Sequence, residues 1–393
     1  MNIRAAFVVL ALAGGLVQPA SSAPAPYVIP VILPITGAGA PLGTLAAASF
    51  KIFEGYANDR GGLRGQPIHF DIHDDTSQPA VAVQLFQNAM TQHPAIVIGP
   101  TPTATCNALA ALAEKTGPVL FCTTPGTLPA RGSYVFCSAM ALPQFDRGII
   151  RYMRLRGFKR LALISSTDGS GQANDAATRD ILALPESKEL QVVTWEHINP
   201  SDISASAQAT HIKNSGAQAI IAWVAGPTFG TVLRGLRDVG VDLPMAPNGA
   251  NVNPDVLTQF NDFLPSDLAL PGFPFMAPEA IRGSTLSKPV SEMLAAYKAA
   301  GEKVSAGGAG YVWDTASIVL AGLRKIGPGA TPEQLRDYIM GVKNFAGIDG
   351  IYDFTAVPDQ HGLSDNNVVM VGWDGKTKDW FPRSKLGSVP LKL

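Results

Sequence analysis

The sequence has few charged residues and no run of like charge. Charged residues make up 16% of its 393 positions, hydrophobic residues make up 46%, and the formal net charge is −1. A nucleic-acid surface or a polybasic membrane patch needs clustered lysine and arginine, so the composition excludes both. The same balance is typical of a folded chain with a large core, and at this length two domains are the natural expectation. We expect a monomer without a nucleic-acid partner.

Motifs of common catalytic, metal and nucleotide sites are also missing. The sequence contains no GxSxG, no HExxH and no P-loop. Gly37 to Gly43 form a glycine-rich loop after the first predicted strand, but their spacing is one residue too long for GxGxxG. His69, Asp71 and His73 alternate along a predicted strand without a fourth ligand, which favours an exposed polar face over a metal site. We expect no cofactor and no metal.

Cysteine is scarce, with Cys106, Cys122 and Cys137 as its three occurrences. Their spacing matches no zinc pattern, and in an oxidising compartment two of them can pair. Cys122 and Cys137 each end a predicted strand, and we expect these strands to be neighbours. We therefore predict a disulfide between Cys122 and Cys137.

The sequence has one long hydrophobic run, at residues 5–17. This run is shorter than the roughly 20 residues that are needed to cross a bilayer. Arg4 precedes this run and small residues follow it at 20–23. This order is typical of a secretory signal, which we assign to residues 1–25. No cysteine lies near the cleavage region, so we expect no lipid anchor and a periplasmic location.

Strands and helices alternate through the rest of the chain. Predicted strands at 27–33, 67–73, 95–99, 118–122 and 134–137 alternate with helices at 44–58, 81–92 and 103–115. A second unit repeats the pattern, with strands at 160–165, 190–197 and 219–224. Further helices follow at 288–300, 311–325 and 332–340, and two strands at 351–354 and 368–373. This order predicts an α/β protein with two doubly wound parallel-sheet lobes.

Two threonine-rich loops follow neighbouring predicted strands. Thr101, Thr103 and Thr105 lie where the strand at 95–99 leads into a helix, and Thr124 and Thr127 follow the next strand. Ligands of open parallel sheets bind beyond the carboxyl ends of the strands, and a helix N-terminus there favours an anion. Thr103 alone is also typical of a helix cap. In the second unit Asp168 precedes a helix, where it is equally typical of a cap or of a ligand contact.

The sequence resembles the Leu/Ile/Val-binding protein family, the type I periplasmic binding proteins that serve branched-chain amino-acid-type ABC transporters. The resemblance covers nearly all of the chain after the signal. It rests on segments that occur in the family's order: LPITG at 33–37, NDRGGLRG at 58–65, DDTS at 74–77, IGP at 98–100, GYVWD at 310–314 and FAGIDG at 345–350, followed by Tyr352, Asp353 and Phe354.

The resemblance implies two lobes joined by three crossovers, which we expect near Pro143, Phe273 and Gly350. Lobe one then holds residues 26–142 and 274–349, and lobe two holds 143–273 and 350–393. A ligand closes the lobes like a hinge, and a membrane permease with ATPase subunits recognises the closed form. The resemblance implies a binding protein and not an enzyme. A ligand-sensing subunit for organic acids or amides and a secreted hydrolase stay open as alternatives, because catalytic triads need no local spacing.

The resemblance also implies a set of ligand contacts. The carboxylate of an amino acid or related small molecule would lie on Thr101, Thr103, Thr124 and Thr127, with Leu42 at the apolar end. Lobe two would contribute Asp168, Phe229 and Asn248. The family usually has an acidic residue for the ligand ammonium where this chain has Asn248, so ammonium recognition must come from Asp168 or be absent. The ligand is therefore either an amino acid or a carboxylate or amide without an ammonium group.

Overall fold

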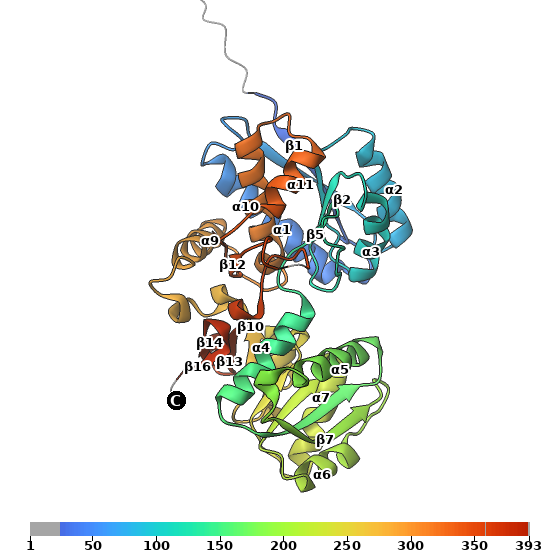
Figure 1. Ribbon diagram of the computed structural model, residues 1–393, viewed down its shortest axis with the longest axis vertical. Helices are drawn as coiled ribbons and strands as arrows, with labels where there is room; N and C mark the ends of the chain where they lie inside the picture. Colours follow the sequence, from blue (N-terminus) through green and yellow to red (C-terminus); the bar gives the residue numbers. More distant parts are fainter. Residues whose placement is uncertain (1–23, 358, 392–393) are drawn as a thin grey trace, which may run out of the picture.

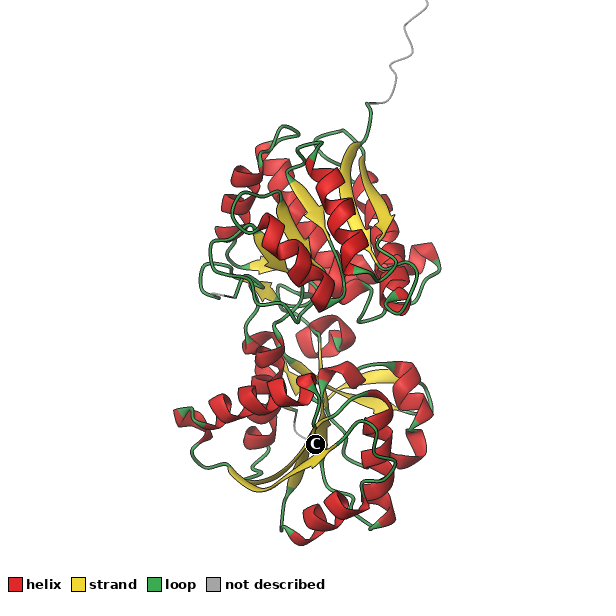
Figure 2. Ribbon diagram, turned by 90° about the vertical axis from the view of Figure 1, so that its right-hand side faces the viewer, coloured by secondary structure: helices red, strands yellow, loops and turns green. Residues whose placement is uncertain are grey.

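The computed structural model describes residues 24–357 and 359–391, which form two lobes stacked along the long axis of the molecule (Figure 1). The predicted signal at 1–25 lies outside the described residues except for its last two positions. Within the described residues, none of the helices combines the length and the apolar character needed to cross a bilayer. Figure 2 shows each lobe as a sheet with helices packed around it.

Lobe one is built on a five-stranded parallel sheet of order β2-β1-β3-β4-β5. Its strands are β1 (Tyr27–Leu33), β2 (Ile68–Asp74), β3 (Ile96–Ile98), β4 (Val119–Cys122) and β5 (Val135–Cys137). Its helices are α1 (Ala40–Asn58), α2 (Pro79–Met90), α3 (Thr103–Ala113), α9 (Ser287–Ala300), α10 (Ala309–Ile326) and α11 (Pro332–Met340). A short antiparallel pair, β11 (Phe345–Ala346) with β12 (Ile351–Tyr352), follows α11.

The alternating direction of side chains along the strands of lobe one explains why helices cover both faces of its sheet. Val31 and Leu33 belong to the buried cluster that includes Phe50 of α1, while Ile32 belongs to a second cluster that includes Phe86 of α2. Successive side chains of a strand point to opposite faces, so strands that are apolar at every position need a helix layer on each side. The sequence run VIL at 31–33 therefore encodes the doubly wound arrangement.

Lobe two repeats this design with a four-stranded parallel sheet of order β7-β6-β8-β9. Its strands are β6 (Arg160–Ser166), β7 (Gln191–Ile198), β8 (Ala219–Trp223) and β9 (Met245–Pro247), and its helices are α4 (Leu142–Leu155), α5 (Gly169–Leu182), α6 (Ser206–Asn214), α7 (Gly226–Asp238) and α8 (Pro254–Gln259). An antiparallel sheet of β10 (Leu270–Gly272), β13 (Val369–Asp374) and β14 (Asp379–Pro382) and a pair of β15 (Ser384–Lys385) with β16 (Val389–Pro390) complete it. The predicted fold of two doubly wound lobes is confirmed.

The chain passes between the lobes three times. The first passage joins β5 to α4, and the second leads from β10 toward α9. The third differs from the expected position near Gly350. The side chain of Gln360 still donates to Ser133 Oγ of lobe one at 3.2 Å, whereas Asn366 accepts from Arg151 of α4 at 3.0 Å. The third passage therefore lies after Gln360, because hydrogen bonds hold this residue to lobe one.

Two of the segments that resemble the family, at 310–314 and 345–350, contact each other in lobe one. The carboxylate of Asp314, in α10, accepts the backbone N–H groups of Ile348 at 2.8 Å and Asp349 at 2.9 Å. A Cβ on Gly347 would lie 2.3 Å from Asp314 Oδ2, so only glycine fits there. The segments GYVWD and FAGIDG are thus the two halves of one buried turn.

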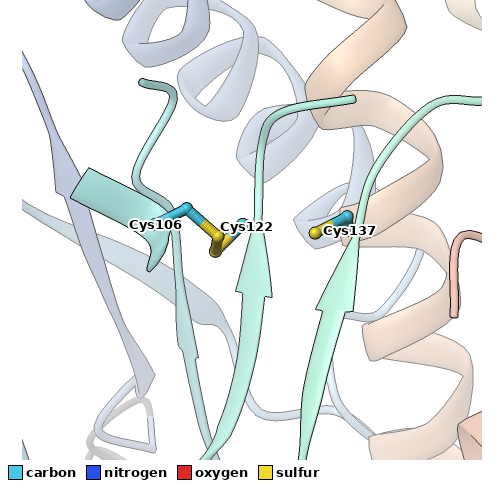
Figure 3. Close-up of side chains that lie close together, drawn as sticks. All are labelled: Cys106, Cys122 and Cys137. Carbon is cyan, nitrogen blue, oxygen red and sulfur yellow. A yellow bond between two sulfur atoms is a disulfide. The ribbon is translucent and has the colours of Figure 1, made fainter. Parts of the chain in front are cut away.

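The disulfide joins Cys106 to Cys122, with Cα atoms 6.0 Å apart, and the predicted Cys122–Cys137 pair is wrong (Figure 3). Cys122 and Cys137 are register partners on β4 and β5, as expected. Side chains of register partners on parallel strands point the same way, side by side. Cys106, in the first turn of α3, instead approaches Cys122 from the helix layer that covers this face of the sheet. Cys137 is a buried free thiol, and burial raises its pKa.

The disulfide assignment predicts the outcome of peptide mapping without reduction. We expect a linked Cys106–Cys122 peptide and a single thiol, Cys137, that reacts after denaturation. The double variant Cys106→Ala/Cys122→Ala should lose about 3 kcal/mol of unfolding free energy, because a loop of this length is no longer closed in the unfolded chain. Cys137→Ala serves as the control that leaves the disulfide intact. A Cys122–Cys137 link in the map would contradict the structure.

Asp146 of α4 is buried, with an exposed fraction of 5%, and burial raises its pKa to about 8. The unfolded chain has the ordinary, lower aspartate pKa, so folding takes up a proton between the two values. Stability therefore falls as the pH rises from about 4 to about 8.

Removing this charge should stabilise the protein in alkaline buffer. We expect Asp146→Asn to raise the melting temperature by a few degrees at about pH 8, with a smaller gain at about pH 5. Asp180→Asn, at an exposed position of α5, is the matched control and should change neither value. A gain for Asp146→Asn that is the same at both pH values would show that its carboxyl titrates normally in the folded protein.

Candidate ligand-binding site

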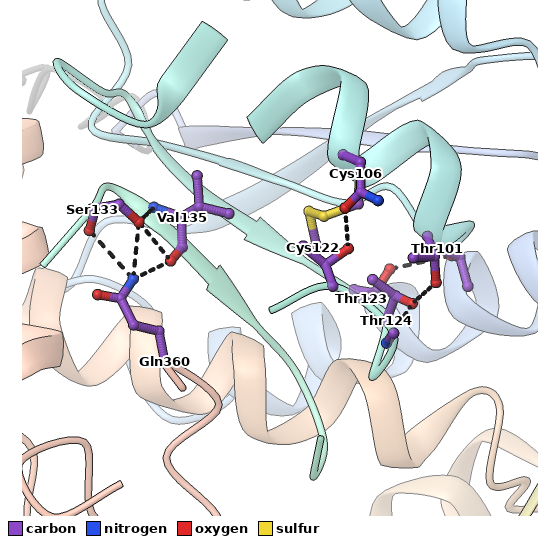
Figure 4. The surroundings of a disulfide bond; sticks show 12 residues. Thr101, Cys106, Cys122, Thr123, Thr124, Ser133, Val135 and Gln360 are labelled. Atoms are coloured by element: carbon purple, nitrogen blue, oxygen red, sulfur yellow. Dashed lines mark hydrogen bonds between the residues drawn. A yellow bond between two sulfur atoms is a disulfide. The ribbon is translucent and has the colours of Figure 1, made fainter. Parts of the chain in front are cut away.

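The two threonine-rich loops lie side by side, because β3 and β4 are neighbours in the parallel sheet. The hydroxyls of Thr101 and Thr123 are 3.2 Å apart (Figure 4). Those of Thr103 and Thr124 are 3.0 Å apart. A Cβ on Gly126 would lie 2.3 Å from Thr103 Oγ1, so the close approach of the loops requires glycine there. The carboxyl ends of two strands thus form one polar surface.

The N-terminus of α3 lies within this surface. Pro102 occupies the cap position and gives no side-chain cap, and the Thr103 hydroxyl pairs with Thr124 instead of capping the helix. The first N–H that bonds within the helix is that of Cys106, to Pro102 O at 2.9 Å. Within the described residues, the amides of Thr103, Ala104 and Thr105 therefore make no hydrogen bond, and they lie beside the threonine hydroxyls. Such an N-terminus favours an anion through its free amides and its dipole.

The predicted threonines differ in how exposed they are. Thr101, Thr124 and Thr127 are nearly buried, whereas Thr103 is half-buried. Thr127 donates its hydroxyl to Asn107 Oδ1 at 2.9 Å, which ties its loop to α3. Thr103 is therefore the most accessible hydroxyl of the group, and Thr127 contributes through the backbone and by positioning its loop.

The disulfide lies directly behind these hydroxyls. Cys106 follows Thr103 by three positions in α3, and Cys122 immediately precedes Thr123 at the end of β4 (Figure 4). The covalent bond therefore joins the helix that carries one loop to the strand that carries the other. Donors that are held in place before binding lose little conformational freedom when a ligand arrives.

Leu42 lies at the start of α1 with 44% of its surface exposed. Its side chain approaches Gly307, where an added Cβ would lie 2.7 Å from Leu42 Cδ2. The exposed part of Leu42 offers apolar surface at this position. The sequence reasoning missed Leu128, which directly follows Thr127 and has 62% of its surface exposed.

Asp168 is the N-cap of α5 in lobe two. Its Oδ1 accepts from Gly171 N at 3.0 Å, from Ser166 Oγ at 2.7 Å, and from the backbone and hydroxyl of Ser170. These hydrogen bonds, that of Gly171 foremost, lower the pKa of Asp168, so the carboxylate is ionised. Oδ2 makes no hydrogen bond within the described residues. Asp168 is a cap whose second oxygen faces solvent.

The other two residues expected from lobe two have different surroundings. Asn248 is half-buried, and its Oδ1 accepts the N–H of Ala250 at 2.8 Å, which leaves its amide nitrogen for a ligand. Phe229 has no exposed surface and packs edge-on against Phe260 with ring centroids 6.4 Å apart. Its role as a ligand contact is contradicted, because this face of α7 is turned into the core of lobe two.

Few charged side chains lie at the carboxyl ends of the strands. The segments at 34–39, 99–102, 123–130, 138–141, 167–168, 224–225 and 248–253 contain no lysine and no arginine, and Asp168 is their single acidic residue. The loops after the edge strands β2 and β7 add Asp75, which is buried, and Asp202, and Arg131 lies further along the loop between β4 and β5. An anion at these loops would be bound by hydroxyls and amides. A cationic group would have one carboxylate to meet.

A separate cavity lies at the other end of lobe two. It measures about 360 Å³ and is lined by apolar residues such as Leu233, Val241 and Phe263. Its wall includes Met245, the first residue of β9, so it opens at the amino ends of the strands. We place the candidate site at the threonine loops instead, because their polar groups converge there.

Comparisons with known proteins agree with this architecture. A family model described as periplasmic binding protein matches residues 26–378. The leucine-, isoleucine-, valine-, threonine- and alanine-binding protein of Pseudomonas aeruginosa is 23% identical over 220 residues, which span 55% of this chain and 58% of that relative.

Solved structures cover nearly the whole chain. An extracellular ligand-binding receptor from Rhodopseudomonas palustris HaA2 has a TM-score of 0.71 at 18% identity, over 90% of this chain and 99% of its own. A putative branched-chain amino acid ABC transporter protein from Rhodospirillum rubrum has a TM-score of 0.70 at 20% identity, over 91% of this chain and 99% of its own. The family model spans most of the sequence, and the chain therefore belongs to the periplasmic binding protein family, as its resemblance to the Leu/Ile/Val-binding proteins predicted.

Proposed function

We propose that this protein is the periplasmic substrate-binding component of an ABC transporter. It captures an amino acid or a related small monocarboxylate between its lobes and delivers it to a permease with ATPase subunits. The single observation that carries the proposal is the polar surface of lobe one, where paired threonine hydroxyls surround the uncapped N-terminus of α3. The family membership of the chain supports the transport role.

A carboxylate fits this surface chemically. The free amides of the first turn of α3 donate to one carboxylate oxygen, and the hydroxyls of Thr103 and Thr124 can turn to donate to the other. Because these donors are neutral, the site compensates one negative charge through hydrogen bonds and the helix dipole. A second carboxylate on the same ligand would find no cationic side chain at 99–102 or 123–130, the segments that carry the threonines. The site therefore selects a monoanion or a zwitterion.

Lobe two completes the site when the hinge closes. Asp168 Oδ2 and the side-chain amide nitrogen of Asn248 are two polar groups at the strand ends of lobe two that make no hydrogen bond within the described residues. A ligand held by lobe one reaches them only in the closed form, so it binds that form more tightly. This difference in affinity is what shifts the hinge equilibrium toward closure.

The surroundings of the hydroxyls argue against an enzyme. A nucleophilic hydroxyl needs a general base within hydrogen-bond reach. In the described part of the chain, Thr103 and Thr124 pair with each other, and Thr101 pairs with Thr123. No histidine or carboxylate bonds to any of these four hydroxyls. The hydrogen bonds of these hydroxyls suit ligand binding and do not activate a nucleophile.

A matched set of ligands tests the proposed carboxylate site. A thermal-shift screen of amino acids and organic acids comes first, since a ligand at 100 times its Kd stabilises the protein by about 2.7 kcal/mol. Calorimetry then compares L-leucine, 4-methylpentanoate, which lacks the ammonium, and leucinamide, which lacks the carboxylate. We expect leucinamide not to bind. A screen in which no carboxylate stabilises the protein would contradict the proposed function.

Thr103→Val should weaken the binding of every carboxylate about ten-fold or more, or about 1.4 kcal/mol, because an accessible hydroxyl of the site is lost. Thr258→Val, at an exposed position in lobe two, is the matched control and should leave the affinity unchanged. An unaltered Kd in Thr103→Val would place the carboxylate elsewhere.

Asp168→Asn distinguishes the two ligand classes. Asparagine keeps the oxygen that caps α5, so the helix is preserved while the charge is lost. We expect the variant to bind L-leucine at least ten-fold more weakly, because the ammonium loses its carboxylate. Binding of 4-methylpentanoate should be unchanged or stronger. Equal losses for both ligands would show that Asp168 acts through the fold and not through its charge.

A further inference from the structure

His361 is a fully buried histidine whose two ring nitrogens both face carbonyl oxygens. It lies in the third passage between the lobes, with an exposed fraction of 0%. Nε2 is 2.7 Å from the backbone oxygen of Thr127, and Nδ1 is 3.2 Å from the backbone oxygen of Ala139. Both distances are those of hydrogen bonds, and both partners can only accept.

This arrangement satisfies only one protonation state completely. A neutral imidazole has one N–H, so it can donate to one carbonyl while its other nitrogen presents a lone pair to the second. An imidazolium donates to both. Since a buried acceptor without a donor costs free energy, the geometry favours the protonated ring.

The two carbonyls belong to segments that matter for binding. Thr127 lies in the loop that carries Thr124, and Ala139 lies in the first passage between the lobes, with a φ of +59°. The preceding residue, Gln360, donates to Ser133 Oγ and to the backbone oxygen of Val135. Residues 360 and 361 therefore fasten the loop at 124–135 and the start of the hinge to the third passage.

Few ionisable side chains lie on the segments packed against His361. Asp359 of its own segment accepts the His361 backbone N–H at 3.1 Å, so this carboxylate lies at the backbone of His361. Cys137 of β5 is a buried thiol whose pKa is raised by burial, so it stays neutral. Arg131 of the loop is exposed to solvent. Asn107 of α3, the partner of Thr127, carries no charge.

We propose that His361 is a proton-dependent positioning residue for the carboxylate site. Its protonated ring holds the Thr127 loop and the hinge segment at Ala139 together, and it adds a buried positive charge behind the loop that receives the carboxylate. Affinity for a carboxylate therefore falls when the ring loses its proton. By linkage, binding of a carboxylate promotes proton uptake by His361. This inference rests on the proposed function.

Calorimetry with L-leucine and 4-methylpentanoate at pH values from about 5.5 to about 8 tests the proposal. We expect the Kd of the probe that binds to rise about ten-fold between about pH 5.5 and about pH 8, with proton uptake that is visible when buffers of different ionisation enthalpy are compared. In His361→Gln, whose side chain stays neutral, this dependence of Kd on pH should disappear. His211→Gln in lobe two, where the side chain is 65% exposed and beside Glu196, is the matched control and should keep the slope.

A second measurement needs neither a ligand nor a folded variant. Nuclear magnetic resonance of the unliganded wild-type protein should show N–H protons on both ring nitrogens of His361 at low pH and on one at high pH. Binding with a flat pH profile, a slope that survives in His361→Gln, or a single N–H across the range would each overturn the proposal. Failure of both probes to bind at any pH, with two N–H signals at low pH, would count against the proposed function, while the two signals would still support a protonated His361.

Discussion

The parallel pairing of β3 with β4 is the constraint on which the candidate site depends. It brings the carboxyl ends of two strands together, and with them the loops that carry Thr103 and Thr124. The Cys106–Cys122 disulfide then fixes the helix after β3 to the end of β4. If β4 paired elsewhere, the hydroxyls would not meet and the N-terminus of α3 would be an ordinary helix start.

The fold could be predicted from the sequence because its signals are local and repeated. Apolar runs such as VIL at 31–33 encode strands covered on both faces, and the family segments encode turns. Asn58, for example, uses its side chain to hold the backbone of Ile68 at the start of β2. Asp74 accepts the N–H groups of Ile35 and Thr36 at the end of β1. These residues build the frame of the site, so they identify the family without identifying what it binds.

The candidate site could be predicted only where it follows from strand order. The adjacency of the threonine loops is of this kind. The predicted Cys122–Cys137 disulfide was wrong. Strand order places Cys122 beside Cys137, but it does not show that α3 directs Cys106 toward Cys122. Phe229 was misplaced because the direction of this face of α7 depends on Phe260, which directly follows α8 and packs against Phe229. His361 had no sequence signal, since its partners are backbone oxygens more than 200 positions away.

A crystal structure of the protein with its bound carboxylate, obtained with the tightest ligand of the screen, tests the central claim most directly. The account predicts closed lobes, with the carboxylate oxygens within hydrogen-bond distance of the first-turn amides of α3 and of Thr103 Oγ1, and with Asp168 and Asn248 approaching from lobe two. A ligand in the cavity beside Leu233 and Phe263, or a carboxylate held by lobe two alone, would contradict it.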